Sequence, residues 1–513
     1  MSLFSNKDKK IDMNSAVKTN HSSASDLFDS IDDNIKFVKD LFKDVDILRA
    51  RSFENNHNSK IKYAIFYSEG LVDTNLINHY IIEPLISTEI ISKDKDLISY
   101  IKDKVIVNSI VKKSTETKEI IEAISYGDTV VFVDGSSSAL LLDSKKFNLR
   151  GPVEPEGERV LSGPREGFVE GIMTNISMVR RRLLTNELKL KFMKIGKQSK
   201  TSVCVAYLDN VVNKNILKEV LRRLEKIDID AIIDSNYLVE FIAEKSPFGF
   251  NTTGATERPD VVVGKVLEGR IAIFVDGTPV VITAPYLFVE NFQSSEDYYL
   301  HPIYASFSRI LRIVSFIIGV TVPGLFITMV GFHHEMLPSA LMINFATERT
   351  GVPLPAAPEC FLLLFMFDLL RETGVRMPYH VGQTMSIVGA LVIGQAAVEA
   401  NLVAGPMIIV VAFAGITILL IPRLTTATLV SRYMCLIFAS TLGYTGLMVS
   451  VAIILVHILN LHSFGVPVLL SFRNLKTQEV KDSFVRMSWP KMLTRMGPLA
   501  TNIKRQSKLQ DKR

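Results

Sequence analysis

Two aspartates, each followed by a glycine, carry the carboxylates whose placement first suggests acid–base chemistry. Asp134-Gly135 and Asp276-Gly277 each follow an apolar run, at about 140 residues' spacing. General acid–base catalysis needs a second titratable group in reach, and no neighbouring His, Lys or acid fits such a pair at fixed spacing. Asp-Gly between two apolar runs is also the common hairpin turn, because Gly accepts a positive φ. We therefore interpret these four residues as structural turns.

The other motifs that carry chemistry are missing from the sequence. A phosphate-binding loop needs Ser or Thr after Gly-Lys, but Gly264-Lys265 is followed by valine. His333-His334-Glu335 does not form H-E-x-x-H, and adjacent histidines on a helix point apart. The three cysteines form no C-x-x-C pair. We expect no enzymatic activity, no cofactor and no metal.

Four polar side chains lie in or beside long apolar runs. Glu359 and Asp368 flank the run CFLLLFMF, Gln395 lies within another run, and Glu399 follows it. A carboxylate at the centre of a membrane helix costs about 2.5–3.5 kcal/mol on insertion scales, which favours a bundle interior or a water-filled path. We take these four as candidate pore residues. The alternative is that 356–370 is no full span and its acids lie at interfaces; three prolines around its start favour a broken or re-entrant segment.

Small residues recur on one face of a predicted membrane helix. Gly382, Ser386, Ala390 and Gly394 follow each other every four residues. Small side chains at this spacing let two helix backbones approach closely. The spacing predicts a helix-packing face, against either the same chain or a second copy.

The elements that must position these residues are apolar runs of membrane length. About 20 helical residues cross a hydrocarbon core of about 30 Å. Four runs contain no Asp, Glu, Lys or Arg: 313–332, 379–398, 402–421 and 433–460. We predict an all-α polytopic membrane domain at 296–472 with four to six spans. The uncharged run 433–472 is long enough to fold back once, and six crossings would place the basic residues on one side.

The remaining chain is more polar. Of its 513 residues, those before 300 and after 472 carry most of the charge, and the net charge of +5 is too small to indicate nucleic-acid binding.

Residues 1–30 resemble a disordered lead-in without a secretory signal. Tyr298, Tyr299, Arg309 and Arg312 form the approach to the membrane. Residues 473–513 carry 11 Lys and Arg against three Asp and Glu, which indicates a basic cytoplasmic tail.

An internal similarity organises the polar front end. The stretches VVFVDGSSSALLL and IAIFVDGTPVVIT match, each after a strand and a helix of similar pattern. We predict an α/β soluble front end of two tandem related α/β subdomains. Their ranges are 31–150 and 172–295, with a Pro- and Gly-rich linker at 151–171. Alternating strands and helices suggest a mixed or parallel sheet in each.

Five stretches together carry a family resemblance. They are GPREGFVE (163–170), SPFGF to VVITAP (246–285), SSEDYY (294–299), LPSALM to GVPLP (337–355) and MSWPKMLTRMGPLA (487–500). Over residues 60–498 the chain resembles the A subunit of the GerA-type spore germinant receptors.

This resemblance implies a multi-pass protein of the spore inner membrane, with its front domain and tail in the spore core. It implies a transporter-like B subunit and a lipoprotein C subunit as partners, and a homo-oligomer that conducts cations when a nutrient germinant binds, on this chain or on a partner. No ligand residue is carried over from the family. The rival hypotheses are a secondary transporter, a membrane-tethered ligand-binding or signalling protein, and a membrane-tethered enzyme with its chemistry in residues 60–290.

Overall fold

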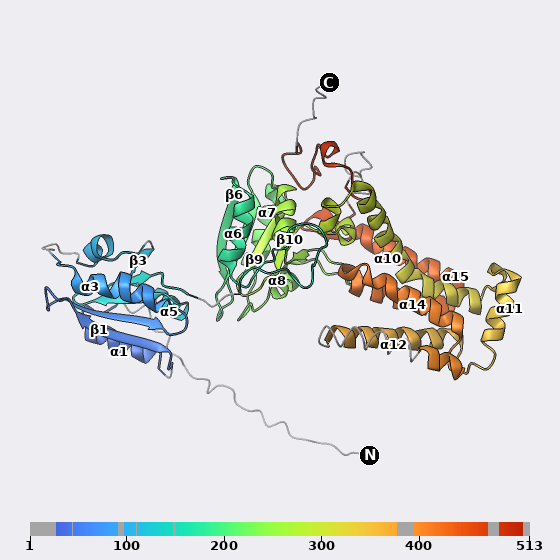
Figure 1. Ribbon diagram of the computed structural model, residues 1–513, viewed down its shortest axis with the longest axis horizontal. Helices are drawn as coiled ribbons and strands as arrows, with labels where there is room; N and C mark the ends of the chain where they lie inside the picture. The colour runs from blue at the N-terminus through green and yellow to red at the C-terminus, as the bar shows by residue number, and fades with distance from the viewer. Residues whose placement is uncertain are drawn as a thin grey trace, which may run out of the picture. The chain divides into compact units, whose positions relative to one another are not determined.

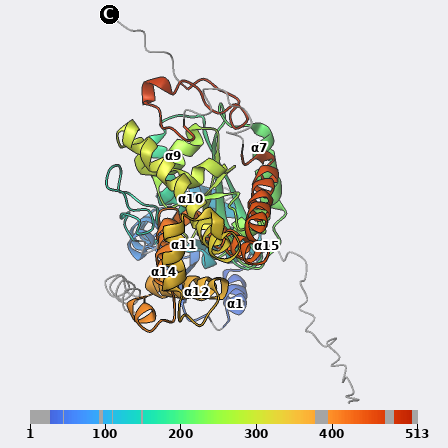
Figure 2. The same cartoon turned by 90° about the vertical axis from the view of Figure 1, so that its right-hand side faces the viewer.

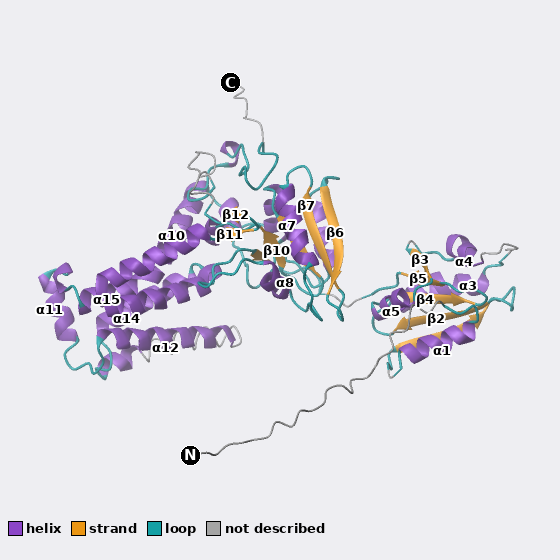
Figure 3. Cartoon of the chain, turned by 180° about the vertical axis from the view of Figure 1, so that it is seen from behind, coloured by secondary structure: helices purple, strands orange, loops and turns teal. Residues whose placement is uncertain are grey.

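The computed structural model describes residues 27–43, 45–90, 97–108, 110–146, 150–376, 394–469 and 482–505. The chain divides into two compact units, Met1–Asn148 and Leu149–Arg513, and each is described by itself. Most of the predicted lead-in lies outside the described residues. In each subdomain the strands form one sheet with helices on both faces (Figure 3).

The first unit contains a five-stranded sheet in the order β1-β2-β4-β5-β3. Strands β1 and β3 and helices α1, α3 and α5 of this unit are labelled in Figure 1. Along β2, Tyr63 and Ile65 face one core while Ala64 and Phe66 face the other, as the two-residue period of a strand requires. The strands are β1 (Leu48–Glu54), β2 (Lys62–Ser68), β3 (Val111–Ser114), β4 (Thr129–Val133) and β5 (Ala139–Leu142). Helices α1 (Ile31–Leu41) and α5 (Thr117–Ser125) cover one face. The other face carries α2 (Thr74–Leu76), η2 (Ile77–Ile82), α3 (Glu83–Ser87), α4 (Leu97–Tyr100) and η3 (Ile101–Val105).

The second subdomain repeats this arrangement, with the order β6-β7-β9-β10-β8. Its strands are β6 (Leu188–Ile195), β7 (Thr201–Leu208), β8 (Gly254–Thr256), β9 (Ile271–Val275) and β10 (Val281–Ala284). Helices α6 (Ile172–Arg182) and α9 (Pro259–Leu267) lie on one face, and α7 (Lys214–Glu225) and α8 (Ser235–Ile242) on the other. The two folds therefore have the same strand order and the same helix layers.

The predicted mixed or parallel sheets are wrong, because every neighbouring strand pair in both sheets is antiparallel. Strands β3 and β4, which α5 joins along the chain, do run in the same direction. The hairpin strand β5 lies between them, and β10 separates β8 and β9 in the same way. Alternation of strands and helices along the chain shows how strands are connected, but it does not show which strands become neighbours.

The Asp-Gly pairs lie in the β4–β5 and β9–β10 connections. Gly135 and Gly277 have φ values of 78° and 90°, which a residue with a Cβ rarely adopts. The Oδ1 atom of Asp134 accepts a hydrogen bond from the first backbone N–H of α1, at 3.2 Å. Asp276 accepts the same bond from the first N–H of α6, also at 3.2 Å. Each carboxylate thus satisfies a free donor at a helix N-terminus, where negative charge is favourable.

A helix bundle follows the second subdomain (Figures 1 and 2). Its helices are α10 (Pro302–Gly331), α11 (Ser339–Glu348), α12 (Ala356–Arg376), α14 (Gly405–Leu419) and α15 (Thr425–Asn460). Two segments in the described ranges are long and apolar enough to cross a membrane, Pro302–Gly331 and Pro422–Asn460. The predicted run 379–398 lies mostly outside the described residues.

Helix α12 runs unbroken for 21 residues. Of the predicted broken or re-entrant segment, the broken alternative is therefore wrong for Ala356–Arg376, and the re-entrant alternative stays a prediction. Two of the three prolines precede the helix and the third, Pro358, lies in its first turn, where no intrahelical N–H bond is needed.

Helix α15 folds back on itself at Gly443. That residue has φ 60° and ψ −137°, outside helical values. Ser450 Oγ lies 3.3 Å from Cys435 Sγ, although 15 residues of straight helix would separate them by about 22 Å. The uncharged run 433–472, where one fold-back was predicted, therefore holds two antiparallel helical segments.

Candidate functional site at the junction of subdomain and bundle

A short segment, residues 288–298, connects the second subdomain to α10, and we call it the collar. It consists of two 3-10 turns, η4 (Phe288–Phe292) and η5 (Ser295–Tyr298). Ser294 N–H donates to Asp297 Oδ2 at 3.2 Å, which is half of a capping box. The ring of Phe292 lies 6.0 Å from that of Phe316 on α10, edge to face. The collar thus packs directly on the first long apolar helix.

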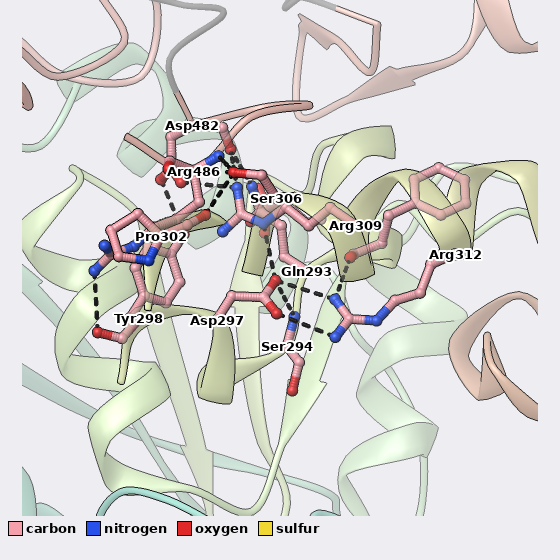
Figure 4. A network of polar contacts seen from close by, with 12 residues as sticks. Gln293, Ser294, Asp297, Tyr298, Pro302, Ser306, Arg309, Arg312, Asp482 and Arg486 are labelled. Carbon is pink, nitrogen blue, oxygen red and sulfur yellow. Dashed lines mark hydrogen bonds and ion pairs between the residues drawn. The ribbon is translucent and has the colours of Figure 1, made fainter. Parts of the chain in front are cut away.

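Asp297 joins the collar to α10 through buried ion pairs (Figure 4). Its Oδ2 accepts hydrogen bonds from Arg309 Nε at 2.8 Å and from Arg312 Nη1 at 3.0 Å. Arg309 is fully buried and Asp297 is 1% exposed. In such a place the charges are stable only together, since removing either one leaves the other buried and uncompensated.

The C-terminal tail completes the same network. Asp482 accepts hydrogen bonds from Arg309 Nη1 at 2.9 Å and from the Tyr298 hydroxyl at 2.9 Å. Arg486 Nη2 donates to the carbonyl oxygen of Tyr298 at 3.1 Å, and its backbone N–H donates to Ser306 Oγ on α10 at 3.0 Å. Three parts of the chain, the collar, α10 and the tail, therefore meet in one cluster (Figure 4).

A second buried cluster fixes the collar to the subdomain and to α15. Glu290 accepts hydrogen bonds from Lys265 and from Arg270 Nε, the latter at 3.0 Å. Burial alone would raise the pKa of Glu290, but the adjacent cations Arg270 and Lys265 outweigh it and hold that pKa below its ordinary value. Arg423, just before α15, donates to the carbonyl oxygens of Glu290 and Gln293 at 3.4 Å each.

These contacts make the collar the common attachment of two apolar helices and the tail. A cavity of about 330 Å³ lies beside it, lined in part by Lys265, Tyr298 and Trp489. Buried ion pairs have discrete arrangements, so a displaced collar must either carry α10 and α15 with it or break these pairs. The arrangement suits transfer of a conformational change from the subdomain to the bundle.

The family model for the Bacillus/Clostridium GerA spore germination protein matches residues 36–497. The chain belongs to the GerA family of spore germination proteins. The resemblance predicted from the sequence is confirmed.

Named relatives agree with this GerA assignment. The chain is 39% identical over 448 residues to spore germination protein KA of Bacillus subtilis (strain 168), which covers 87% of this chain and 82% of that protein. It is 32% identical to spore germination protein GerLA of Bacillus cereus, over 85% of this chain and 88% of that one. Among solved structures, the N-terminal domain of the A subunit of the Bacillus megaterium spore germinant receptor GerK3 is 32% identical. That match covers 52% of this chain and 98% of that domain, with a TM-score of 0.22.

In this GerA-family chain, two of the predicted polar residues form ion pairs, Glu359 fully buried and Asp368 partly buried. Glu359 is fully buried, accepts from Arg349 Nη1 at 2.9 Å, and accepts the backbone N–H of Ala404 before α14 at 2.6 Å. Asp368 accepts from Arg432 Nη2 and from the Tyr433 hydroxyl, each at 2.8 Å. Both carboxylates therefore connect α12 to its neighbours.

The structure does not gather the four predicted pore residues into one site. Glu359 and Asp368 are nine residues apart on α12, about 13 Å along the helix. Gln395 donates to Glu399 at 2.9 Å, and both side chains are exposed. Of the predicted packing face, Gly394 is described and lies 4.0 Å from Ile408 Cγ2, measured from a Cβ built on it. Gly382, Ser386 and Ala390 lie outside the described residues.

Sequence reasoning missed the roles of Asp297, Asp482 and Glu290. It noted the tyrosines and arginines at the approach to the membrane, but the partners of Arg309 lie 12 and 173 residues away. A signal was present, since two arginines in the N-terminal half of a long apolar helix require counter-charges. Within the described ranges, no group of three or more His, Cys, Asp and Glu side chains is arranged to hold a metal ion.

Proposed function

We propose that this chain is the A subunit of a nutrient germinant receptor in the spore inner membrane, and that it forms an oligomeric unit which conducts cations when nutrient is present. The observation that carries the proposal is the collar, in which one buried carboxylate, Asp297, joins the soluble subdomain to the first apolar helix. A receptor subunit needs such a rigid connection, because sensing and conduction take place in different parts of the chain. Family membership supplies the link to germination.

A multi-pass arrangement is supported by the path of α15. Its start is tied to the subdomain by Arg423, which pairs with Glu158 at 2.8 Å. Near its end, His457 Nε2 lies 2.9 Å from Ser246 Oγ, so the helix also returns to that subdomain. A segment that leaves and returns in this way crosses the membrane twice. We place the soluble domain and the tail on the same side, the spore core.

The B and C subunits belong to this proposal as partners, together with further copies of the chain. The nutrient is bound either here or on the B subunit. In the proposed mechanism, nutrient binding moves the collar, and the ion pairs of Asp297 and Glu290 carry this movement to α10 and α15. No covalent step is involved.

Reconstitution tests the proposed function. The chain, with its B and C subunits, is placed in potassium-loaded liposomes, and potassium release is recorded after nutrients are added. We expect release that depends on nutrient and on this chain. Nutrient uptake by this chain alone, without ion release, would instead identify a secondary transporter. Nutrient binding with neither ion release nor uptake would identify a signalling protein.

A further inference from the structure

The described part of the tail, residues 482–505, folds back onto the second subdomain. Ala500 pairs with Val212 in an antiparallel bridge. The N–H of Thr501 donates to the carbonyl oxygen of Val211 at 2.8 Å. Over these residues, the predicted basic tail therefore packs on the subdomain.

The contact is anchored in the core. Leu499 is fully buried among the side chains of α7, α8 and the sheet, and Ala500 lies in the core on the other face. Arg495 Nε donates to the carbonyl oxygen of Leu267 at 2.6 Å. A Cβ on Gly269 would lie 2.7 Å from the Leu499 carbonyl oxygen, so the subdomain is shaped to admit this backbone.

In the first subdomain, the position equivalent to that of Ala500 is filled by residues that follow the last strand. There, Lys145 pairs with Val72 in an antiparallel bridge, and Lys146 N–H donates to the carbonyl oxygen of Leu71 at 2.9 Å. Leu71 and Val72 precede α2 as Val211 and Val212 precede α7. Lys145 follows β5 within three residues. In the first subdomain, the chain thus closes the fold immediately after its last strand.

The second subdomain cannot close itself in this way. After β10, which ends at Ala284, the chain enters the collar and the helix bundle. The corresponding position is filled by residues 498–501, more than two hundred positions later. The helix bundle is therefore inserted between the last strand of a fold and the segment that closes it.

From this we infer that the second subdomain is a peptide-binding module whose ligand is the chain's own closing segment, residues 492–505, bound reversibly by backbone pairing to the β7–α7 connection and a Leu-Ala anchor. The same site accepts this segment as a separate peptide. The segment pairs through its backbone with the connection between β7 and α7, at Val211 and Val212, and its consecutive residues Leu499 and Ala500 enter the cores on the two faces of the sheet. The inference does not depend on the proposed germinant function.

The segment is held by few buried side chains, as a reversibly bound peptide would be. Met492, Leu499 and Ala500 are buried, while its other side chains are half-buried or exposed. Met496 and Arg505 line the cavity beside the collar, so the segment is not close-packed along its length. Release would also loosen Asp482 and Arg486, which precede it in the same stretch of chain.

Trp489 offers a direct signal, because it is the sole tryptophan of the chain. Its ring lies 5.9 Å from the Tyr298 ring, and the Arg505 guanidinium lies 5.7 Å from its centroid. When the segment leaves, the indole, already 46% exposed, loses its contact with the Arg505 guanidinium, and its emission changes.

The test uses the full chain in detergent, with Leu499→Asp and, as matched control, Ile503→Asp. Ile503 is on the same segment and 49% exposed. We expect Leu499→Asp to shift Trp489 emission and to speed trypsin cleavage at Lys491 and Arg495 at least tenfold. We expect Ile503→Asp to do neither. A fluorescein-labelled peptide of residues 492–505 should bind the Leu499→Asp chain at least tenfold tighter than the wild-type chain, whose site is occupied.

A second variant covers the case in which Leu499→Asp does not fold. Thr501→Pro removes the N–H that donates to Val211 and leaves the anchor in place. We expect the same shift and faster cleavage, to a smaller degree. Unchanged emission and cleavage in Thr501→Pro, or equal peptide binding to the wild-type and Leu499→Asp chains, would overturn the inference.

Discussion

Asp297 is a buried carboxylate that faces two arginines of α10. Its replacement by Asn keeps the size and one acceptor but removes the charge that balances Arg309 and Arg312. We expect Asp297→Asn to reduce the free energy of unfolding by about 3 kcal/mol, since breaking a buried pair leaves uncompensated charge. The measurement is the melting temperature of the purified protein. The control is Asp228→Asn, whose pair with Lys197 is exposed and should change stability by less than about 0.5 kcal/mol.

Glu290 gives the collar a predictable response to acid. Its pKa is held below the ordinary value of 4.5, so its stabilising effect is complete above that pH and is lost as the pH falls through the lowered pKa. We expect Glu290→Gln to destabilise the protein at pH 7 and to lose less stability than wild type between pH 7 and pH 3. The check is a series of melting temperatures against pH. Identical acid dependence in both proteins would contradict the assigned ion cluster.

Substitution of the aspartate in each Asp-Gly pair distinguishes a structural role from a catalytic one. An Asn at position 134 or 276 still offers an acceptor to the helix N-terminus. We expect Asp134→Asn and Asp276→Asn to cost less than about 1 kcal/mol and to retain function. A folded protein without activity would favour the tethered-enzyme hypothesis. The readouts are melting temperature and nutrient-triggered potassium release.

At the scale of elements, Gly443 determines the path of α15. Its φ and ψ lie in a region that is costly for other residues, and a Cβ there would approach Phe332 Cγ at 3.0 Å. We expect Gly443→Ala to lower the free energy of unfolding by about 1–3 kcal/mol, measured as loss of melting temperature. The matched control is Gly331→Ala at the end of α10, where an added Cβ meets nothing within 4 Å. A Gly443→Ala protein as stable as this control would contradict the fold-back.

How far the sequence predicts these elements depends on whether the determining contact is local. The repeat was visible because the VDG turns recur with their flanking strands, and each turn depends on neighbouring residues. The antiparallel sheets were not predictable from that pattern, since a hairpin strand, β5 or β10, inserts between two strands joined by a helix.

The site was less predictable for the same reason. Glu359 could be singled out as a costly charge, but its partner Arg349 stands ten residues away across a turn. Asp297 and Asp482 come together only after the helix bundle has returned the chain to its starting subdomain. The spacing of residues along the chain cannot reveal a contact between residues that are so far apart in the sequence.

At the scale of the whole molecule, the helix bundle interrupts a soluble fold. The second subdomain receives its last strand before the bundle and its closing segment after it, and the collar lies at the point of departure. Any change in that subdomain can therefore reach the bundle through several connections, among them the collar, the tail and the contact of Ser246 with His457.

Nutrient-triggered potassium release from liposomes containing the chain with the proposed B and C subunits tests the coupling most directly. Wild type and Asp228→Asn should release potassium when nutrient is added. Asp297→Asn, assembled to the same extent, should lose at least nine-tenths of that response. Full release by an assembled Asp297→Asn complex would contradict the claim that the collar transmits the signal.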